Sequence, residues 1–326
     1  MICLTKYKVV MTNRLMEPAL QNILANCEVK LWEKAEPIPR EQLIEWLKDA
    51  HGLIASGNVR VDEELLQHAP ELKVIAQAAV GYDNIDIAAC TKRGIPFGNT
   101  PGVLVETTAE LTFGLLLCAA RRLHEAWNFV KGGHWVPGNN ISFGMDLTGK
   151  TLGVVGMGQI GVAVARRARA FGMNIIYHNR NRRSDEPQIG AVYRSFTELL
   201  TEADCIIVLT PLAAETRGLF GRKEFALMKK TAYFVNASRG AVVDTPALLE
   251  ALETGKIAYA ALDVTDPEPL PGNHPLLKLP NILIAPHIGS ATVETRTAMA
   301  VLTADNLLAG LAGKPLPACV NRSVNY

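Results

Sequence analysis

Short apolar runs alternate with amphipathic stretches along the whole chain. In the first hundred residues, apolar runs predict strands at 8–11, 29–32, 53–55, 73–76 and 95–97. Apolar residues at helical spacing predict helices over 39–50, 61–68, from 101 to 122 and over 292–310. After residue 150, further apolar runs predict six strands, at 151–155, 174–177, 205–209, 232–235, 257–262 and 281–284. The alternation indicates an α/β protein with parallel sheets, and six strands suit a doubly wound dinucleotide-binding fold.

Composition narrows the function classes. The 326 residues suggest about two domains, and 33 Lys+Arg against 32 Asp+Glu leave no field that would hold nucleic acid. The six cysteines form no C-x-x-C pair, so neither a metal site nor a disulfide framework is expected. We find no signal peptide, and the longest nearly uncharged run, 111–120, is about half of what a membrane span needs. We therefore expect a cytoplasmic protein without a membrane partner.

A glycine-rich motif follows the apolar run at 151–155. Gly156, Gly158 and Gly161 form G-x-G-x-x-G, and the helical run 162–171 comes next. Gly156 allows a tight turn, Gly158 leaves room for a pyrophosphate, and Gly161 lets helix and strand pack closely. The alternative is a tight strand-to-helix turn without a ligand. With a strand before it and a helix after it, the motif predicts a dinucleotide whose phosphates rest on helix N–H groups.

The next strand ends without the acidic residue that usually binds the ribose of NAD. Asn179 and Arg180 stand there instead, followed by Arg182 and Arg183. Asn179 and Arg180, with either later arginine, could hold a 2′-phosphate by charge-assisted hydrogen bonds. A solvated basic turn is the alternative. We predict NADPH as the preferred cofactor and NADH as the second.

A group of candidate binding residues follows the later strands, where open α/β sheets bind ligands. They are Thr210, Pro211, Ala237, Ser238, Arg239, Asp263, Glu268, His287 and Gly289. Arg239 could clamp a carboxylate and polarise a ketone, and His287 could donate a proton near neutral pH. Either Glu268 or Asp266 could orient the imidazole, since spacing alone does not choose. Each of these residues taken singly also has a purely structural interpretation.

Several long motifs in order resemble the D-isomer-specific 2-hydroxyacid dehydrogenase family along essentially the whole chain. They are 80–86 (VGYDNID), the glycine motif, 234–240 (FVNASRG), 262–264 with 268–269, and 285–290 (APHIGS). Within the family, the sequence is most similar to bacterial glyoxylate/hydroxypyruvate reductases and 2-ketogluconate reductases. The absent acidic residue departs from the family pattern and puts NAD use in doubt.

The resemblance implies a catalytic triad of Arg239, Glu268 and His287, with His287 as proton donor. It implies that the N–H groups of Val80 and Gly81 bind the substrate carboxylate together with Arg239 and His287. Further cofactor contacts are implied at Gln159, Ile160, Thr210, Pro211, Thr216, Ala237 and Asp263. Family members are usually homodimers joined through the cofactor domain. Trp135 either approaches the partner's site or packs within its own chain.

The resemblance also implies a Rossmann-type cofactor domain, 101–287, inserted in a smaller flavodoxin-like substrate-binding domain, 1–100 and 288–326. The expected activity is NADPH-dependent reduction of glyoxylate, hydroxypyruvate or 2-keto-D-gluconate to a D-2-hydroxy acid. A dinucleotide-sensing corepressor of the same fold is the alternative. An oxidising relative acting on formate or phosphite is disfavoured, because formate oxidation in the family relies on Gln in place of Glu268. The sequence leaves the preferred acid open.

Overall fold

The computed structural model describes residues 6–324, and the chain divides into two units. One unit contains the chain up to Leu104 and from Ser290 onward, and the other is Val105–Gly289. The second unit is therefore inserted in the first by chain order. The divisions fall at 104/105 and 289/290, where the sequence predicted 100/101 and 287/288.

The described part of the first unit holds a five-stranded parallel sheet. Its order is β2-β1-β3-β4-β5, which is the flavodoxin-like order. The strands are β1 (Tyr7–Met11), β2 (Cys27–Leu31), β3 (Gly52–Ala55), β4 (Val74–Gln77) and β5 (Phe97–Gly98). Val10 lies opposite Lys30 on one side and Leu53 on the other. The α/β class and parallel sheet predicted from the apolar runs are confirmed.

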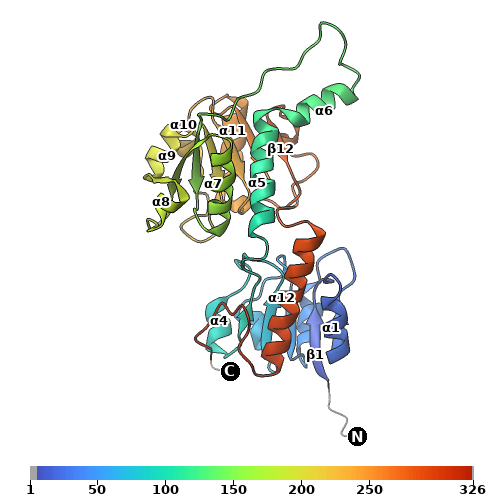
Figure 1. Ribbon diagram of the computed structural model, residues 1–326. Helices are drawn as coiled ribbons and strands as arrows, with labels where there is room; N and C mark the ends of the chain where they lie inside the picture. The colour runs from blue at the N-terminus through green and yellow to red at the C-terminus, as the bar shows by residue number, and fades with distance from the viewer. Residues whose placement is uncertain (1–5, 325–326) are drawn as a thin grey trace. The chain divides into compact units, whose positions relative to one another are not determined.

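Helices cover both faces of this sheet. They are α1 (Ala19–Asn26), α2 (Arg40–Leu47), α3 (Glu63–Gln67), α4 (Ile87–Lys92) and α12 (Val293–Leu311). Ile23 of α1 and Leu307 of α12 are buried in one core, whereas Leu43 of α2 and Leu65 of α3 are buried in another. Helices α1 and α12 thus share one face, as Figure 1 shows.

The second unit, all of which the structure describes, contains a seven-stranded parallel sheet in the order β12-β11-β10-β9-β6-β7-β8. Its strands are β6 (Thr151–Val155), β7 (Asn174–His178), β8 (Val192–Tyr193), β9 (Cys205–Val208), β10 (Tyr233–Asn236), β11 (Tyr259–Leu262) and β12 (Ile282–Ile284). Six of them match the predicted strands. The sequence missed β8, which has two residues.

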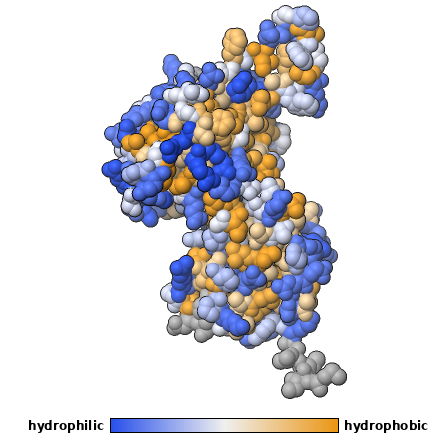
Figure 2. Space-filling model, viewed as in Figure 1, coloured by the Kyte–Doolittle hydropathy of each residue, from blue (hydrophilic) through white to orange (hydrophobic). Residues whose placement is uncertain are grey.

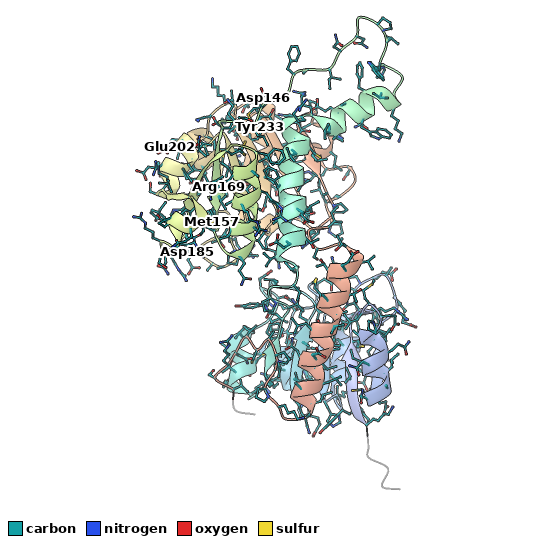
Figure 3. The ribbon with its side chains drawn as sticks, viewed as in Figure 1. Asp146, Met157, Arg169, Asp185, Glu202 and Tyr233 are labelled. Carbon is teal, nitrogen blue, oxygen red and sulfur yellow. The ribbon has the colours of Figure 1, made fainter. Side chains whose placement is uncertain are left out.

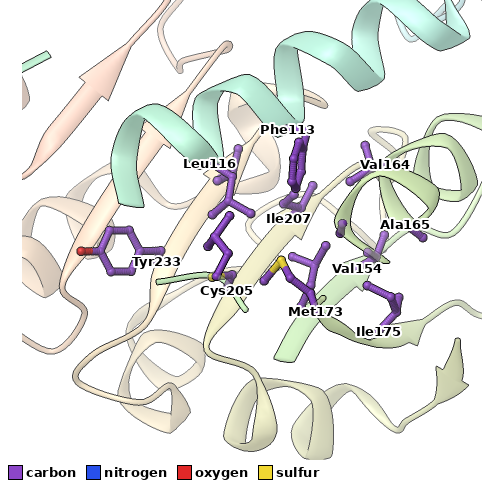
Figure 4. Packing of buried hydrophobic residues seen from close by; sticks show 14 of the residues in the cluster. Phe113, Leu116, Val154, Val164, Ala165, Met173, Ile175, Cys205, Ile207 and Tyr233 are labelled. Atoms are coloured by element: carbon purple, nitrogen blue, oxygen red, sulfur yellow. The ribbon is translucent and has the colours of Figure 1, made fainter. Parts of the chain in front are cut away.

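Helices also cover both faces of the larger sheet. They are α5 (Val105–Ala120), α7 (Gln159–Ala170), α8 (Glu186–Ile189), α9 (Phe196–Glu202), α10 (Arg222–Leu227) and α11 (Thr245–Glu253). A further helix, α6 (Leu123–Lys131), follows α5 and has no buried residue. On one face, Phe113 of α5 and Val164 of α7 pack over Val154 and Ile207 (Figure 4). Helices α9, α10 and α11 contribute to the core of the other face.

The helix predicted from 101 to 122 is shorter than expected. It ends at Ala120, and Arg122 adopts a left-handed conformation with φ of 53° before α6 begins. The Arg122 guanidinium bonds Glu125 of α6, which holds the break. Between residues 6 and 324, no helix has both the length and the apolar character that a membrane crossing requires.

Candidate active site

The turn between β6 and α7 has the shape of a pyrophosphate cradle. Gly156 has φ of 100°, and a Cβ there would lie 2.6 Å from the Thr210 nitrogen. A Cβ on Gly161 would lie 2.7 Å from the Gly156 oxygen, so helix and strand approach closely. A Cβ on Gly158 would meet nothing within 4 Å, which leaves space before the N-terminus of the 12-residue helix α7. Open space at a helix N-terminus fits the phosphates of a dinucleotide.

The residues after β7 hold this turn in place. The Asn179 Oδ1 accepts a hydrogen bond from the Met157 N–H at 2.6 Å, and its Nδ2 donates to the Met157 oxygen at 3.3 Å. Arg183 donates to the same oxygen at 3.0 Å and pairs with Asp185 at 2.7 Å. Figure 3 shows Met157 and Asp185 at the same end of the unit. The Asn179 amide therefore supports the glycine turn.

Arg180 differs from its neighbours in having an exposed guanidinium without a partner. Within residues 6–324, no hydrogen bond or ion pair joins it to another side chain. Arg182, in contrast, bonds Glu186 at 2.6 Å. The hydrogen bond from Arg182, followed by that from Tyr177, keeps the pKa of the Glu186 carboxyl below its usual range. Of the four residues predicted to favour NADPH, Arg180 alone makes no side-chain hydrogen bond or ion pair with a described residue and so keeps all of its donors available to a ligand.

His287 follows β12 in a left-handed turn, with φ of 52°. The turn is held by Asp263, which comes directly after β11. The His287 N–H donates to the Asp263 backbone oxygen at 2.8 Å. The N–H groups of Ile288 and Gly289 donate to Oδ1 and Oδ2 of the same residue at 2.7 and 2.8 Å. These bonds compensate a conformation that costs about 1–2 kcal/mol for a residue with a side chain.

The His287 imidazole pairs with Glu268. Its Nδ1 lies 2.6 Å from the Glu268 Oε1, and no hydrogen bond joins its Nε2 to any other residue that the structure describes. Burial raises the pKa of the Glu268 carboxyl, but the hydrogen bond and charge of His287 outweigh it, and the net value is below the usual range. The carboxyl is then ionised at neutral pH, so Nδ1 donates. The geometry selects Glu268 over Asp266, the alternative that spacing had left open.

Arg239 lies after β10 and approaches the loop that carries Glu268. A Cβ on Gly240 would lie 1.9 Å from the Thr265 oxygen, so only glycine permits this approach. The positive charge of Arg239 contributes to the lowered pKa of Glu268. The structure thus brings the guanidinium, the carboxylate and the imidazole to the edge of the sheet where its parallel strands end. Ligands bind at this edge in open α/β sheets.

Comparisons with known proteins agree with this geometry. Residues 113–289 match the model of the "D-isomer specific 2-hydroxyacid dehydrogenase, NAD binding domain". The chain is 49% identical over 325 residues to a glyoxylate reductase of Thermococcus litoralis, covering 98% of each protein. It is 47% identical over 323 residues to a glyoxylate reductase of Aeropyrum pernix, covering 97% of this chain and 96% of the relative. The chain belongs to the D-isomer-specific 2-hydroxyacid dehydrogenase family.

The dehydrogenase is therefore an NAD(P)-dependent oxidoreductase that interconverts 2-hydroxy and 2-oxo acids. A similar solved structure is the NADPH-dependent glyoxylate/hydroxypyruvate reductase of Sinorhizobium meliloti in complex with NADP and malonate. The TM-score is 0.89 at 31% identity, and the match covers 98% of each chain. The resemblance inferred from the sequence motifs is confirmed, as is the Rossmann-type fold.

The other predicted cofactor contacts of the dehydrogenase lie along the same edge. Gln159 and Ile160 open α7, and Thr210 and Pro211 follow β9. The Thr216 hydroxyl donates to the Pro211 oxygen at 2.7 Å and so ties this loop together. Ala237 and Ser238 follow β10 beside Arg239. Val80 and Gly81, the predicted carboxylate ligands, follow β4 in the first unit.

Sequence reasoning missed the part that Asp263 plays. It was predicted to line the cofactor, and the structure gives both of its carboxylate oxygens to the turn after His287. The sequence could have indicated this role, because Asp263 comes directly after a buried strand. A carboxylate in that position needs hydrogen-bond donors around it. Burial raises the pKa of this carboxyl group above its ordinary value.

Proposed function

We propose that the enzyme reduces small 2-oxo acids to D-2-hydroxy acids with NADPH and that glyoxylate and hydroxypyruvate are its main substrates. The observation that carries the proposal is the His287–Glu268 pair beside the charge of Arg239. When bound, the nicotinamide would supply hydride to the keto carbon. The glycine turn, with Gln159 and Ile160 after it, would hold the phosphates, and Thr210, Pro211, Thr216, Ala237, Ser238, Asp263 and Gly289 would line the rest of the cofactor site.

His287 would donate the proton that the substrate oxygen needs. Glu268 holds Nδ1, which leaves Nε2 as the donor toward the substrate. Arg239 would bind the carboxylate and polarise the ketone through its planar set of donors. The carboxylate would also accept hydrogen bonds from the N–H groups of Val80 and Gly81. The test is oxidation of NADPH with glyoxylate, hydroxypyruvate, 2-keto-D-gluconate and pyruvate, repeated with His287→Asn. An inactive wild type, or full activity in the variant, would refute the assignment.

Arg180 supports the preference for NADPH. Its exposed guanidinium stands where the family's acidic residue would repel a 2′-phosphate. We expect a higher kcat/KM with NADPH than with NADH and a loss of about tenfold in that preference in Arg180→Ala, because a charge-assisted hydrogen bond contributes about 1.5 kcal/mol. Arg121→Ala, which removes an exposed arginine at the end of α5, is the matched control. Equal preference in wild type and Arg180→Ala would contradict this role.

The preferred acid is proposed from the names of the relatives and from the site together. Two relatives that match nearly the whole chain are glyoxylate reductases. The NADP-bound neighbour from Sinorhizobium meliloti carries a small dicarboxylate, malonate. A site that binds a carboxylate through Arg239 suits such small acids, and 2-keto-D-gluconate is the largest candidate. Values of kcat/KM across the panel rank the substrates directly.

We further infer that the enzyme is a homodimer joined through the second unit. Trp135 and Phe143, in the loop after α6, are 75% and 97% exposed, and Trp127 of α6 is also exposed. Figure 2 shows apolar side chains among polar ones over this segment. Exposed aromatic residues in one segment are typical of an interface. Light scattering should give twice the chain mass, and a monomer at micromolar concentration would refute the inference.

A further inference from the structure

The loop after β4 presents three consecutive carbonyl groups to fixed donors. The Ala79 oxygen accepts from the Thr100 N–H at 2.9 Å. The Val80 oxygen accepts from the Asn99 Nδ2 at 2.9 Å, and the Gly81 oxygen accepts from the Gln77 Nε2 at 2.8 Å. The N–H groups of Val80 and Gly81, in contrast, donate to no other residue that the structure describes. All the carbonyls are occupied, and two N–H groups are left for a ligand.

A planar trans peptide links each of these carbonyls to the next N–H. Within one peptide unit the C=O and N–H point in opposite directions, so a donor that fixes the oxygen also aims the N–H. The unit from Ala79 to Val80 is fixed by a backbone donor. The unit from Val80 to Gly81 carries the Gly81 N–H and is fixed by the Asn99 side chain. The direction of the Gly81 N–H therefore depends on Asn99.

Asn99 is itself held rigidly. It is buried, its N–H donates to the Ala318 oxygen at 3.3 Å, and its backbone oxygen accepts from the Asn306 Nδ2 at 3.0 Å. The Asn306 Oδ1 in turn accepts from the Ala318 N–H at 2.9 Å, which closes a small network. The Asn99 amide therefore has a fixed position from which it reaches the loop.

We propose that Asn99 is a positioning residue for the substrate carboxylate. It holds the peptide between Val80 and Gly81 so that the Gly81 N–H stays aimed at the carboxylate. The inference rests on the proposed function, because it needs the N–H groups of Val80 and Gly81 to bind that group. Gln77 fixes the following peptide unit, which carries neither of these N–H groups, so its effect on carboxylate binding is smaller.

Asn99→Leu tests the inference, since leucine has a similar size and no hydrogen-bond donor. We expect the KM for glyoxylate and the Ki of oxamate, a carboxylate inhibitor, to rise about tenfold, which corresponds to about 1.4 kcal/mol. We expect kcat to change less than threefold and the Kd for NADPH, from fluorescence titration, to stay unchanged. If this variant does not fold, Asn99→Ser, with a side chain too short for the Val80 oxygen, takes its place.

Asn321→Leu is the matched control. Asn321 is a buried amide of the same unit that accepts from the Phe97 N–H at 2.8 Å and donates to the Ile95 oxygen at 2.9 Å. Its loss loosens the start of β5 without touching the carbonyls of the loop, so KM and Ki should stay within twofold of wild type. A rise below threefold in the Asn99 variant, or an equal rise in the control, overturns the inference. Failure of the proposed function is distinguishable, because wild type itself would then reduce no acid, which overturns both.

Discussion

The turn that carries His287 can be tested by replacing Asp263 with Asn. The Asp263 carboxylate accepts from the Ile288 and Gly289 N–H groups at 2.7 and 2.8 Å, and Asp263 is 2% exposed. An asparagine of the same shape has one accepting oxygen and one NH₂ group. The NH₂ would face one of these N–H groups, so one hydrogen bond is lost and two donors are placed together.

The size of the effect follows from two opposing terms. A hydrogen bond to a charged group contributes about 1.5–3 kcal/mol. The left-handed conformation of His287 costs about 1–2 kcal/mol, and after the loss of one bond only two of the three bonds to Asp263 remain to compensate it. Burial raises the pKa of Asp263, which means that its charge is held at a cost that neutral Asn avoids. We therefore expect a modest loss of stability and a larger loss of activity, since a 1 Å displacement of a catalytic group can cost about 100-fold in rate.

Two measurements separate the effects. Steady-state kinetics with saturating NADPH should show kcat reduced about 10- to 100-fold, while urea denaturation shows a folded variant. Asp204→Asn is the control, because the Asp204 carboxylate accepts from the Thr151 N–H at 2.9 Å and from Lys229 at 2.8 Å, away from His287. We expect Asp204→Asn to have a lower free energy of unfolding than wild type and an unchanged kcat. Unchanged kcat in Asp263→Asn, or a fall no larger than in the control, would show that the clamp does not position the imidazole.

Two further changes follow from the site. In Glu268→Gln the imidazole of His287 loses the carboxylate that accepts from its Nδ1. The kcat for reduction should therefore fall about fivefold for a pair worth about 1 kcal/mol, and an unchanged kcat would contradict the pairing. In Gly158→Val the added Cβ lies in space that is open to 4 Å, so the melting temperature should hold while the Kd for NADPH rises at least about tenfold; unchanged affinity would place the phosphates elsewhere.

Most of the fold could be predicted because buried parallel strands are nearly continuous apolar runs. Those runs located six of the seven strands of the larger sheet. The strand β8, Val192–Tyr193, has too few residues to form a pattern. The end of α5 at Ala120 could not be predicted for a different reason. Arg121 and Arg122 are also typical of the last turn of a helix, so the pattern extended the helix through them. The left-handed Arg122 depends on its bonds to Glu125, which spacing does not reveal.

The candidate site was predictable in its members and less so in its contacts. Residues after parallel strands must meet at one edge, which located Arg239 and His287. Spacing alone did not choose Glu268 over Asp266; the family resemblance implied Glu268, and the structure places its Oε1 2.6 Å from the His287 Nδ1. Asn179 shows the same limit. Its amide serves the backbone of the glycine turn in the structure, and its contact with a 2′-phosphate stays a prediction.

The left-handed backbone of His287 also decides how its role should be tested. Among the described residues, only Arg122 and His287 combine a side chain with a positive φ. Asparagine adopts this conformation more readily than most residues, whereas alanine does not. His287→Asn should therefore keep the turn and its bonds to Asp263 while it removes the proton donor. We expect its reduction rate to fall at least about 100-fold, the contribution of a positioned acid, with NADPH affinity and melting temperature near those of wild type. Alanine would lose rate through the turn as well, so a fall in rate identifies the proton donor only in the asparagine variant. An asparagine variant that folds, binds NADPH and still turns over at full rate would refute the role of His287.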